Sequence, residues 1–382
     1  MTKTRRLILL LTALLLPGFP MQATSGAAQE GTAAPSRWRW HGALGLFGKY
    51  DANLELVPHD TPLPTSTDSF GMEGNIRLSV ERSFGPAWWF EARLVATGNG
   101  YVERSEENWY HGNVGFSLNH TRGANLWSLY VEPRFYTVPG ENEFDFFRNT
   151  AILSWQRSLS ERTVVTVGYE NLLARYPETE SLDHVIHGAF SEVRLSLSPD
   201  LSTQFSYGFQ FYQGHGESEE HPFLNSPSYG FRHTATVGLD AAFLGENTLF
   251  ATYSLQLDTS SGESLHLVSA FEGDEETLDV ETEFNFLEQK GTLLYTHRFP
   301  AAISASLFVE LISKSFFNPE ELFEIAEHEH ADLLLTVVPK LALPLTPAWE
   351  IDLRYIFRMN ASTRNEEDFH DHVVNLGLTF RF

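Results

Sequence analysis

The stretch that decides the fold reads LSTQFSYGFQF and covers residues 201–211. Its odd positions carry Leu, Thr, Phe, Tyr, Phe and Phe, and its even positions carry Ser, Gln, Ser, Gly and Gln. Successive side chains of a β-strand point to opposite faces of the sheet. The alternation therefore predicts a strand with one apolar face and one polar face.

The same period of two recurs along the whole chain. Residues 38–50 set Trp, Leu and Tyr against Arg, His and Lys, and residues 70–81 and 349–358 show the same division. Each run lasts about 10–14 residues, whereas strands in soluble domains have roughly five or six. Runs of that length favour strands that cross a bilayer over strands of a soluble sandwich.

Short and long connections alternate between these runs. The short ones lie at 85–87, 121–124, 158–162, 199–200, 244–246, 300–302 and 345–347. The long ones lie at 52–68, 99–108, 139–144, 175–184, 213–228, 317–330 and 361–370. A transmembrane β-barrel combines short periplasmic turns with longer outer loops, so the fold class predicted is all-β, a transmembrane antiparallel up-and-down barrel.

The ends of the strands support this interpretation. Aromatic residues gather there, as in an interfacial girdle, and the last strand alternates at Leu376, Leu378, Phe380 and Phe382. In these features the sequence resembles bacterial outer-membrane β-barrel proteins of the porin-like kind. Its last strand is similar to the assembly signal of that family. The resemblance implies an integral outer-membrane protein that contacts lipid and lipopolysaccharide and is inserted by the barrel-assembly machinery.

Residues 260–290 leave two possible numbers of strands, 18 and 16. Within them, residues 278–286 alternate as a membrane strand would, and residues 265–271 could supply a partner. Residues 272–276 would then form an inner turn and residues 288–291 an outer one. We favour 18 strands on this basis; the alternative is 16 strands plus an acidic outer hairpin. Either even number places both termini in the periplasm.

The N-terminus predicts export from the cytoplasm. Lys3, Arg5 and Arg6 precede an apolar run at 7–16, which is the pattern of a signal peptide and is too short to span a bilayer. We therefore expect a signal peptide at 1–28, cleaved after Ala23 or Ala28, a periplasmic linker at 29–37 and a single barrel domain at 38–382.

Composition excludes several functional classes. The 382 residues contain no cysteine, and 50 acidic residues outweigh 26 basic ones for a formal net charge of −24. Binding to nucleic acid needs a basic surface, so it is not expected. The long loops, with Asp51, Asp145 and Asp371 included, hold 25 acidic and 3 basic residues, and residues 258–286 hold nine acidic and no basic ones. The acidity therefore belongs to the outer rim, whereas the wall is mixed in charge.

The inward phase of the strands supplies the candidate pore-lining residues. Charged side chains dominate it, and cross-strand ion pairs on a hydrated wall account for many of them. The set is Arg39, Lys49, Glu73, Arg77, Glu81, Trp89, Glu91, Arg93, Trp109, Glu132, Arg134, Arg148, Arg194, Arg232, Asp240, Lys314, Glu350, Asp352, Arg354 and Arg358.

Three classes of function fit such a barrel. The first is an export conduit for a secreted polysaccharide that works with a periplasmic export protein; inward aromatic residues such as Phe47 and the short third loop at 139–144 favour it. The second is a passive diffusion porin or a substrate-specific uptake channel. The third, an outer-membrane enzyme or assembly factor, has less support, and we expect no enzymatic activity and no cofactor.

The histidines raise one question about metal binding. His328 and His330, and likewise His370 and His372, stand two residues apart and could place two imidazoles on one face of an extended segment. Histidines solvated in loops explain the same pattern. These residues are therefore weak metal candidates, and no metal is expected.

Overall fold

The computed structural model describes residues 38–51, 69–102, 108–137, 145–177, 183–214, 229–260, 266–272, 275–281, 286–316, 330–363 and 369–382. The predicted signal peptide at 1–28 and linker at 29–37 lie outside these residues. No helix among the described residues is long and apolar enough to cross a bilayer.

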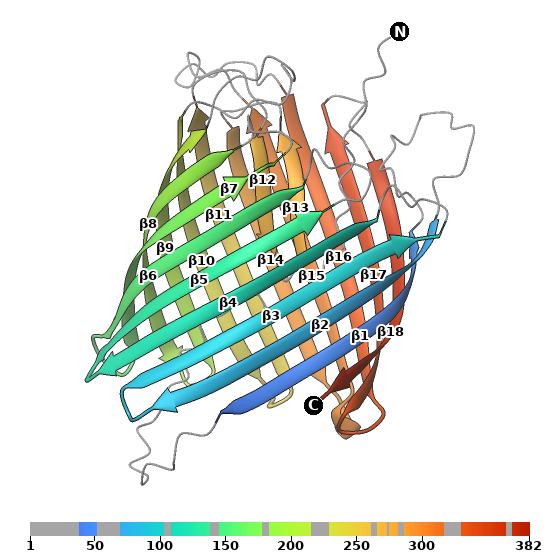
Figure 1. The fold of residues 1–382 in the computed structure, drawn as a ribbon, viewed down its shortest axis with the longest axis horizontal. Helices are drawn as coiled ribbons and strands as arrows, with labels where there is room; N and C mark the ends of the chain where they lie inside the picture. The colour runs from blue at the N-terminus through green and yellow to red at the C-terminus, as the bar shows by residue number, and fades with distance from the viewer. Residues whose placement is uncertain are drawn as a thin grey trace.

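Sixteen antiparallel strands close into one barrel (Figure 1). The first eight are β1 (Arg39–Asp51), β2 (Ser69–Phe84), β3 (Trp88–Tyr101), β4 (Trp109–Arg122), β5 (Asn125–Thr137), β6 (Phe146–Ser158), β7 (Thr163–Arg175) and β8 (His184–Ser198). The other eight are β9 (Leu201–Gly214), β10 (Gly230–Phe243), β11 (Asn247–Ser260), β14 (Phe286–Arg298), β15 (Ser304–Phe316), β16 (His330–Pro344), β17 (Trp349–Ser362) and β18 (Phe369–Arg381). The predicted all-β, up-and-down antiparallel barrel is confirmed.

The barrel closes where its first and last strands meet. β1 pairs with β18 from Ala43 opposite Arg381 to Asp51 opposite Val373. The terminal Phe382 extends this pairing, because its backbone N–H and C=O both bond to the backbone of Gly42, at 3.0 and 2.9 Å. Closure leaves no strand edge without a partner, which a sheet in hydrocarbon requires.

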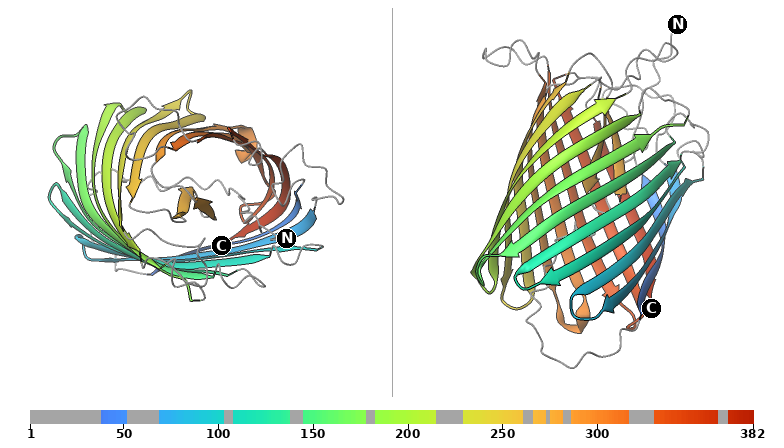
Figure 2. Two further views of the ribbon diagram at one scale, coloured as in Figure 1. Left: turned by 90° about the horizontal axis from the view of Figure 1, so that it is seen from above. Right: turned by 60° about the vertical axis from the view of Figure 1, so that its left-hand side comes forward.

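The two ends of the barrel differ. Short turns join the strands at the end where β1 begins and β18 finishes, which we call the turn end (Figure 2). Gly85 and Gly123 have φ values of 74° and 60° in two of these turns, a conformation that favours glycine. The longer connections lie at the opposite end, which we call the loop end.

The favoured number of 18 strands was wrong, and the alternative of 16 is correct. β12 (His266–Glu272) and β13 (Glu275–Glu281) pair only with each other, while β11 pairs directly with β14. Residues 288–291, expected to form an outer turn, lie inside β14. Seen along the barrel axis, the β12–β13 hairpin falls within the outline of the ring (Figure 2).

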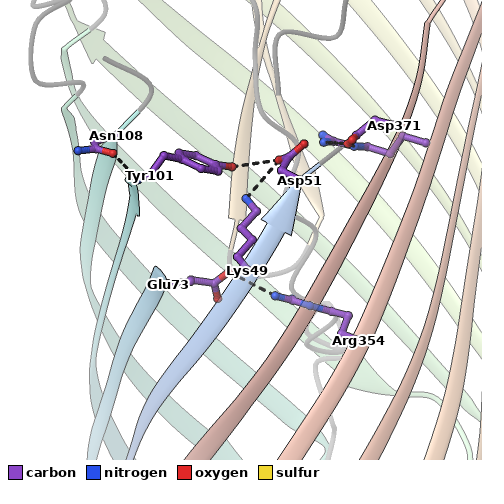
Figure 3. A network of polar contacts seen from close by, with 8 residues as sticks. Lys49, Asp51, Glu73, Tyr101, Asn108, Arg354 and Asp371 are labelled. Atoms are coloured by element: carbon purple, nitrogen blue, oxygen red, sulfur yellow. Dashed lines mark hydrogen bonds and ion pairs between the residues drawn. The ribbon is translucent and has the colours of Figure 1, made fainter. Parts of the chain in front are cut away.

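The two faces of the wall have opposite characters. Large apolar side chains on one phase are exposed, for example Trp40 at 68% and Phe70 at 65% of their surface. The other phase carries polar and charged side chains, many of them buried, such as Lys49, Asp51 and Glu73. Inside the barrel Lys49 and Asp51 point toward each other, and Glu73 points toward Arg354 (Figure 3). The apolar phase therefore faces outward to lipid and the polar phase faces inward.

Candidate translocation channel

A network of buried charges crosses the inside of the barrel at its closure. Arg354 on β17 reaches Glu73 on β2, with Nη2 3.3 Å from Oε2, although β18 and β1 lie between their strands. Arg358 on β17 donates from Nε to Asp371 on β18 at 3.0 Å. Figure 3 shows Arg354 and Glu73 pointing toward each other from opposite sides of the seam. We call this set, with the two residues described next, the seam network.

Lys49 and Asp51 complete the seam network on β1. Lys49 Nζ lies 3.8 Å from the Asp51 carboxylate, and Tyr101 Oη on β3 donates to the same carboxylate at 3.1 Å. Both β1 side chains are fully buried, and Asp371 is fully buried as well. Buried charges need an opposite charge nearby, and each of these has one: Lys49 and Asp51 pair with each other, and Asp371 pairs with Arg358.

Similar contacts line the wall around β9–β15. Asp258 on β11 accepts from Arg232 Nε at 2.8 Å and from Tyr212 Oη at 2.7 Å. Lys290 on β14 lies 3.1 Å from Glu310 on β15. Each pair joins neighbouring strands or spans one strand, so the inner face is held laterally as well as by the backbone ladder.

On other strands the ion pairs run along the barrel axis. Glu91 and Arg93 on β3 lie 2.7 Å apart, and so do Glu132 and Arg134 on β5. Residues two apart on a strand share a face, and here that face is the inner one. Acid and base thus alternate along the interior, and the wall is close to neutral at these levels.

Exposure of the inward side chains changes steeply along the axis. Near the turn end the side chains of Arg39 and Arg381 are 65% and 58% exposed, although they contact Glu81 and Glu350. Midway along β17 the side chain of Arg354 is 4% exposed, and nearer the loop end that of Arg358 is 0% exposed. The inner face is therefore open to water at the turn end and covered toward the loop end.

Rings cover the inner face of β4–β7 near the loop end. Trp109 stacks on Tyr136 and Tyr136 stacks on Phe146, with centroids 6.3 and 5.3 Å apart, and Phe146 packs on Tyr176. Phe146 and Tyr176 are 4% exposed, and Trp109 is 8% exposed. The inward aromatic side chains that sequence suggested as a polymer contact here pack mainly against one another.

The predicted pore-lining residues all lie on the inward phase of their strands. Buried members include Lys49, Glu73, Trp109, Arg134, Arg148, Asp352, Arg354 and Arg358. More accessible members include Arg39, Arg77, Glu81, Trp89, Glu91, Arg93, Glu132, Arg194, Arg232, Asp240, Lys314 and Glu350. That any of them lines a conducting pore stays a prediction.

Sequence reasoning missed part of the seam network. It assigned Asp51 and Asp371 to the outer rim, and it placed Asp258 in the doubtful segment. All three are fully buried on the inner face. The alternation of apolar and polar residues in their strands continues through these three aspartates. The phase alone could therefore have assigned them to the inner face. Tyr101, which the sequence analysis placed in the loop at 99–108, is instead the last residue of β3.

Asp371 and the two histidines beside it, His370 and His372, divide between the two faces of β18. Asp371 points inward to Arg358, whereas His370 and His372 lie on the outward phase with ring centroids 5.8 Å apart. His372 Nδ1 is 2.5 Å from the Tyr355 hydroxyl. No group of three metal-binding side chains occurs in the part of the chain that the structure describes. His328 and the side chain of His330 lie outside that part.

Comparisons with known proteins add a likeness of fold. No family model matches the chain, and no curated protein matches its sequence. Among solved structures, a Salmonella typhi OmpF complex with daunomycin is 9% identical with a TM-score of 0.54, covering 91% of this chain and 98% of that one. A loop-deletion mutant of Vibrio cholerae OmpT, described as an outer membrane protein, is 8% identical with a TM-score of 0.51, covering 91% and 99%.

A structure described as a bacterial polysaccharide outer membrane secretin is 10% identical, with a TM-score of 0.45 and coverage of 89% and 98%. At these identities the likeness concerns the fold alone. The closed antiparallel sheet, its apolar outward face and the likeness to the OmpF and OmpT structures show that the chain has the fold of porin-like outer-membrane β-barrels.

Proposed function

We propose that the barrel is a gated translocation channel in the outer membrane, serving as an export conduit for a secreted polysaccharide. The observation that carries the proposal is the gradient of exposure along the inner face. A conduit that opens only during export should be accessible from the side where cargo is loaded and covered on the other. The turn end matches the loading side, which we place in the periplasm together with both termini.

The chemistry of the accessible part suits a neutral or weakly charged hydrophilic polymer. At the turn end Arg39 faces Glu81 and Arg381 faces Glu350, at 3.3 and 2.7 Å. Paired charges of this kind hydrate the wall without holding a sugar polymer of either sign tightly, and a conduit needs contacts weak enough to release cargo. A separate periplasmic protein would deliver the polymer to this end and open the loop end.

A passive porin is the second candidate, and one observation favours it. Sixteen strands leave an aqueous channel unless something fills the interior, and 16-stranded barrels include the porins. In that case the paired charges would be the lining of a permanently open pore, and solutes would cross by diffusion.

Single-channel conductance of the refolded barrel in a planar bilayer separates the two candidates. The gated conduit should be silent or nearly so, and a variant lacking residues 266–281 or the addition of the periplasmic partner should raise its open probability. A steady open pore in the full chain, with a reversal potential that shifts under a salt gradient, would reject the gated conduit and support the porin.

Cargo is tested separately from gating. A neutral polysaccharide added to the turn-end side should cause transient blockades of the opened channel, longer for longer chains. If only small ions or monosaccharides blocked the channel, the protein would still be a channel, but a polymer would be rejected as its cargo.

A further inference from the structure

The outward face of the barrel is almost free of charge, and the exceptions are grouped. On the sixteen barrel strands, every acidic residue that the structure describes lies on the inward phase. The outward phase holds Arg175 at the loop end and three arginines at the turn end, Arg82, Arg122 and Arg157. The three belong to β2, β4 and β6, so they occupy one side of the barrel.

None of these three arginines has an acidic partner among the described residues, although inward arginines on the intervening strands β3 and β5 do. Arg93 and Arg134, for example, each contact a glutamate at 2.7 Å. Glu161 and Arg162 lie in the turn that follows β6 and offset each other in sign. The group of Arg82, Arg122 and Arg157, which we call the arginine band, therefore presents uncompensated positive charge to the membrane surface.

Aromatic side chains accompany each arginine of the band. The guanidinium of Arg82 lies 4.9 Å from the ring centroids of both Trp38 and Phe84. Trp127 and Trp155, beside the other two arginines, have centroids 6.1 Å apart. Tryptophan at a strand end marks the boundary between hydrocarbon and headgroups. The arginine band thus lies at the level of lipid phosphates.

The structure also has a pocket at this place. It is an open surface pocket of about 690 Å³ lined by Arg122, Gly123, Asn125, Trp127 and Trp155. Two hydrogen bonds connect its lining residues. Trp155 Nε1 donates to Asn125 Oδ1 at 3.2 Å, and Asn125 Nδ2 donates to the Arg122 carbonyl at 3.3 Å.

The strand register places a second arginine beside this pocket. Asn125 stands opposite Arg122 on β4 and opposite Arg157 on β6. The two arginines are therefore two strand spacings apart, roughly 10 Å between backbones, and long side chains from both sides can reach one anion between them. Guanidinium groups bind phosphate oxygens with charge-assisted hydrogen bonds.

We propose that the arginine band, centred on the pocket at Arg122 and Arg157, is a binding site for an anionic phospholipid of the leaflet at the turn end. The phosphate lies between the two guanidiniums, and an acyl chain lies along Trp127 and Trp155. Charge complementarity selects this occupant, because the outward face of β2–β6 carries only positive charge at this end and no described acidic residue of these strands lies on that face. Basic residues that only contact lipid headgroups in general would surround the whole barrel, whereas the arginine band is confined to β2–β6.

Native mass spectrometry of the full barrel in detergent, titrated with phosphatidylglycerol, tests the site. Roughly 1 kcal/mol per arginine near a headgroup predicts that the double variant Arg122→Gln/Arg157→Gln binds the lipid about 27-fold more weakly, at 1.4 kcal/mol per tenfold. Arg122→Lys/Arg157→Lys should keep part of the affinity. Zwitterionic phosphatidylcholine should bind more weakly than phosphatidylglycerol to the unchanged protein.

The matched control is Arg175→Gln, which removes an outward arginine at the loop end that is paired with Asp183 at 2.5 Å. It should leave lipid binding unchanged, and heat-dependent gel mobility confirms that each variant is folded. Equal affinity of the glutamine variant and the unchanged protein would overturn the proposal. So would an equal loss in Arg175→Gln, or a band that binds a second copy of the chain instead of lipid. The channel proposal does not depend on either result.

Discussion

Arg354 on β17 and Glu73 on β2 form an ion pair across the inside of the barrel, and 281 positions of sequence separate them. Their side chains are 4% and 0% exposed. The pair therefore holds the strands that flank the closure of the barrel, from a place that water does not reach. Neither residue can lose its partner without leaving a buried charge.

Arg354→Met should consequently be among the most destabilising single changes in the wall. Removing one partner of a buried pair costs about 3–5 kcal/mol, because Glu73 would be left buried without its partner. The measurement is urea unfolding in lipid vesicles, followed by tryptophan fluorescence. Arg39→Met is the control, since its pair with Glu81 is exposed and such pairs contribute about 0–1 kcal/mol. Equal destabilisation by the two changes would contradict a special role for the seam network.

The sequence could predict the faces of this wall but not its long-range pairing. Alternation is a local property, and it placed residues such as Arg354 and Glu73 on the inner phase correctly. The contact between them depends on which strands close the ring, and no local pattern records that. The same limit explains the wrong strand number. Residues 278–286 alternate as wall strands do, yet β11 pairs directly with β14, which begins only at Phe286.

The burial of the charged inward residues also could not be predicted from the sequence. A charged inward residue is expected to meet water in a wide barrel, and Arg39 does so. Asp51 and Arg358 are also charged and lie on the same inner face, but they are fully buried near the loop end. Burial depends on what covers a residue, and the pattern of one strand does not contain that information.

Close packing at the closure gives a second prediction. A Cβ added at Gly377 would lie 2.0 Å from Cδ1 of Phe47 and 2.6 Å from the backbone oxygen of Leu46. Since backbone cannot move aside as a flexible side chain can, Gly377→Ala should destabilise the barrel by about 1–3 kcal/mol. Gly208→Ala is the control, because nothing lies within 4 Å of its added Cβ. The temperature at which gel mobility changes to that of the unfolded chain should fall for the first variant only.

The gradient of exposure can be measured with single cysteines, because the chain has none of its own. A thiol at Arg381→Cys, near the turn end, should react with a water-soluble methanethiosulfonate reagent at least about tenfold faster than one at Thr336→Cys, which is 1% exposed. Reactivity follows access to the thiolate. Equal rates at the two positions would mean that water fills the interior from end to end, and the gated conduit would lose its main support.

The last residue allows a prediction about assembly. Phe382 is hydrogen-bonded to the backbone of Gly42, and its ring stacks on Phe380 with centroids 5.7 Å apart. If the terminal strand is the signal that the assembly machinery reads, Phe382→Ala should lower the amount of folded barrel in the outer membrane of cells more than it slows refolding in detergent. Burial of a phenylalanine side chain contributes roughly 1.5–3 kcal/mol, but Phe382 is 60% exposed, so the effect on stability should be smaller than that.

The control for this variant is Phe84→Ala, which removes an outward phenylalanine at the same end, 46% exposed, that belongs to no terminal strand. It changes the exposed aromatic surface in a similar way and leaves the last strand intact. Both variants should refold in detergent at nearly the same rate, and only Phe382→Ala should be depleted from membranes of cells. A parallel loss of both in cells would indicate that lipid contact of the ring matters and that the terminal position does not.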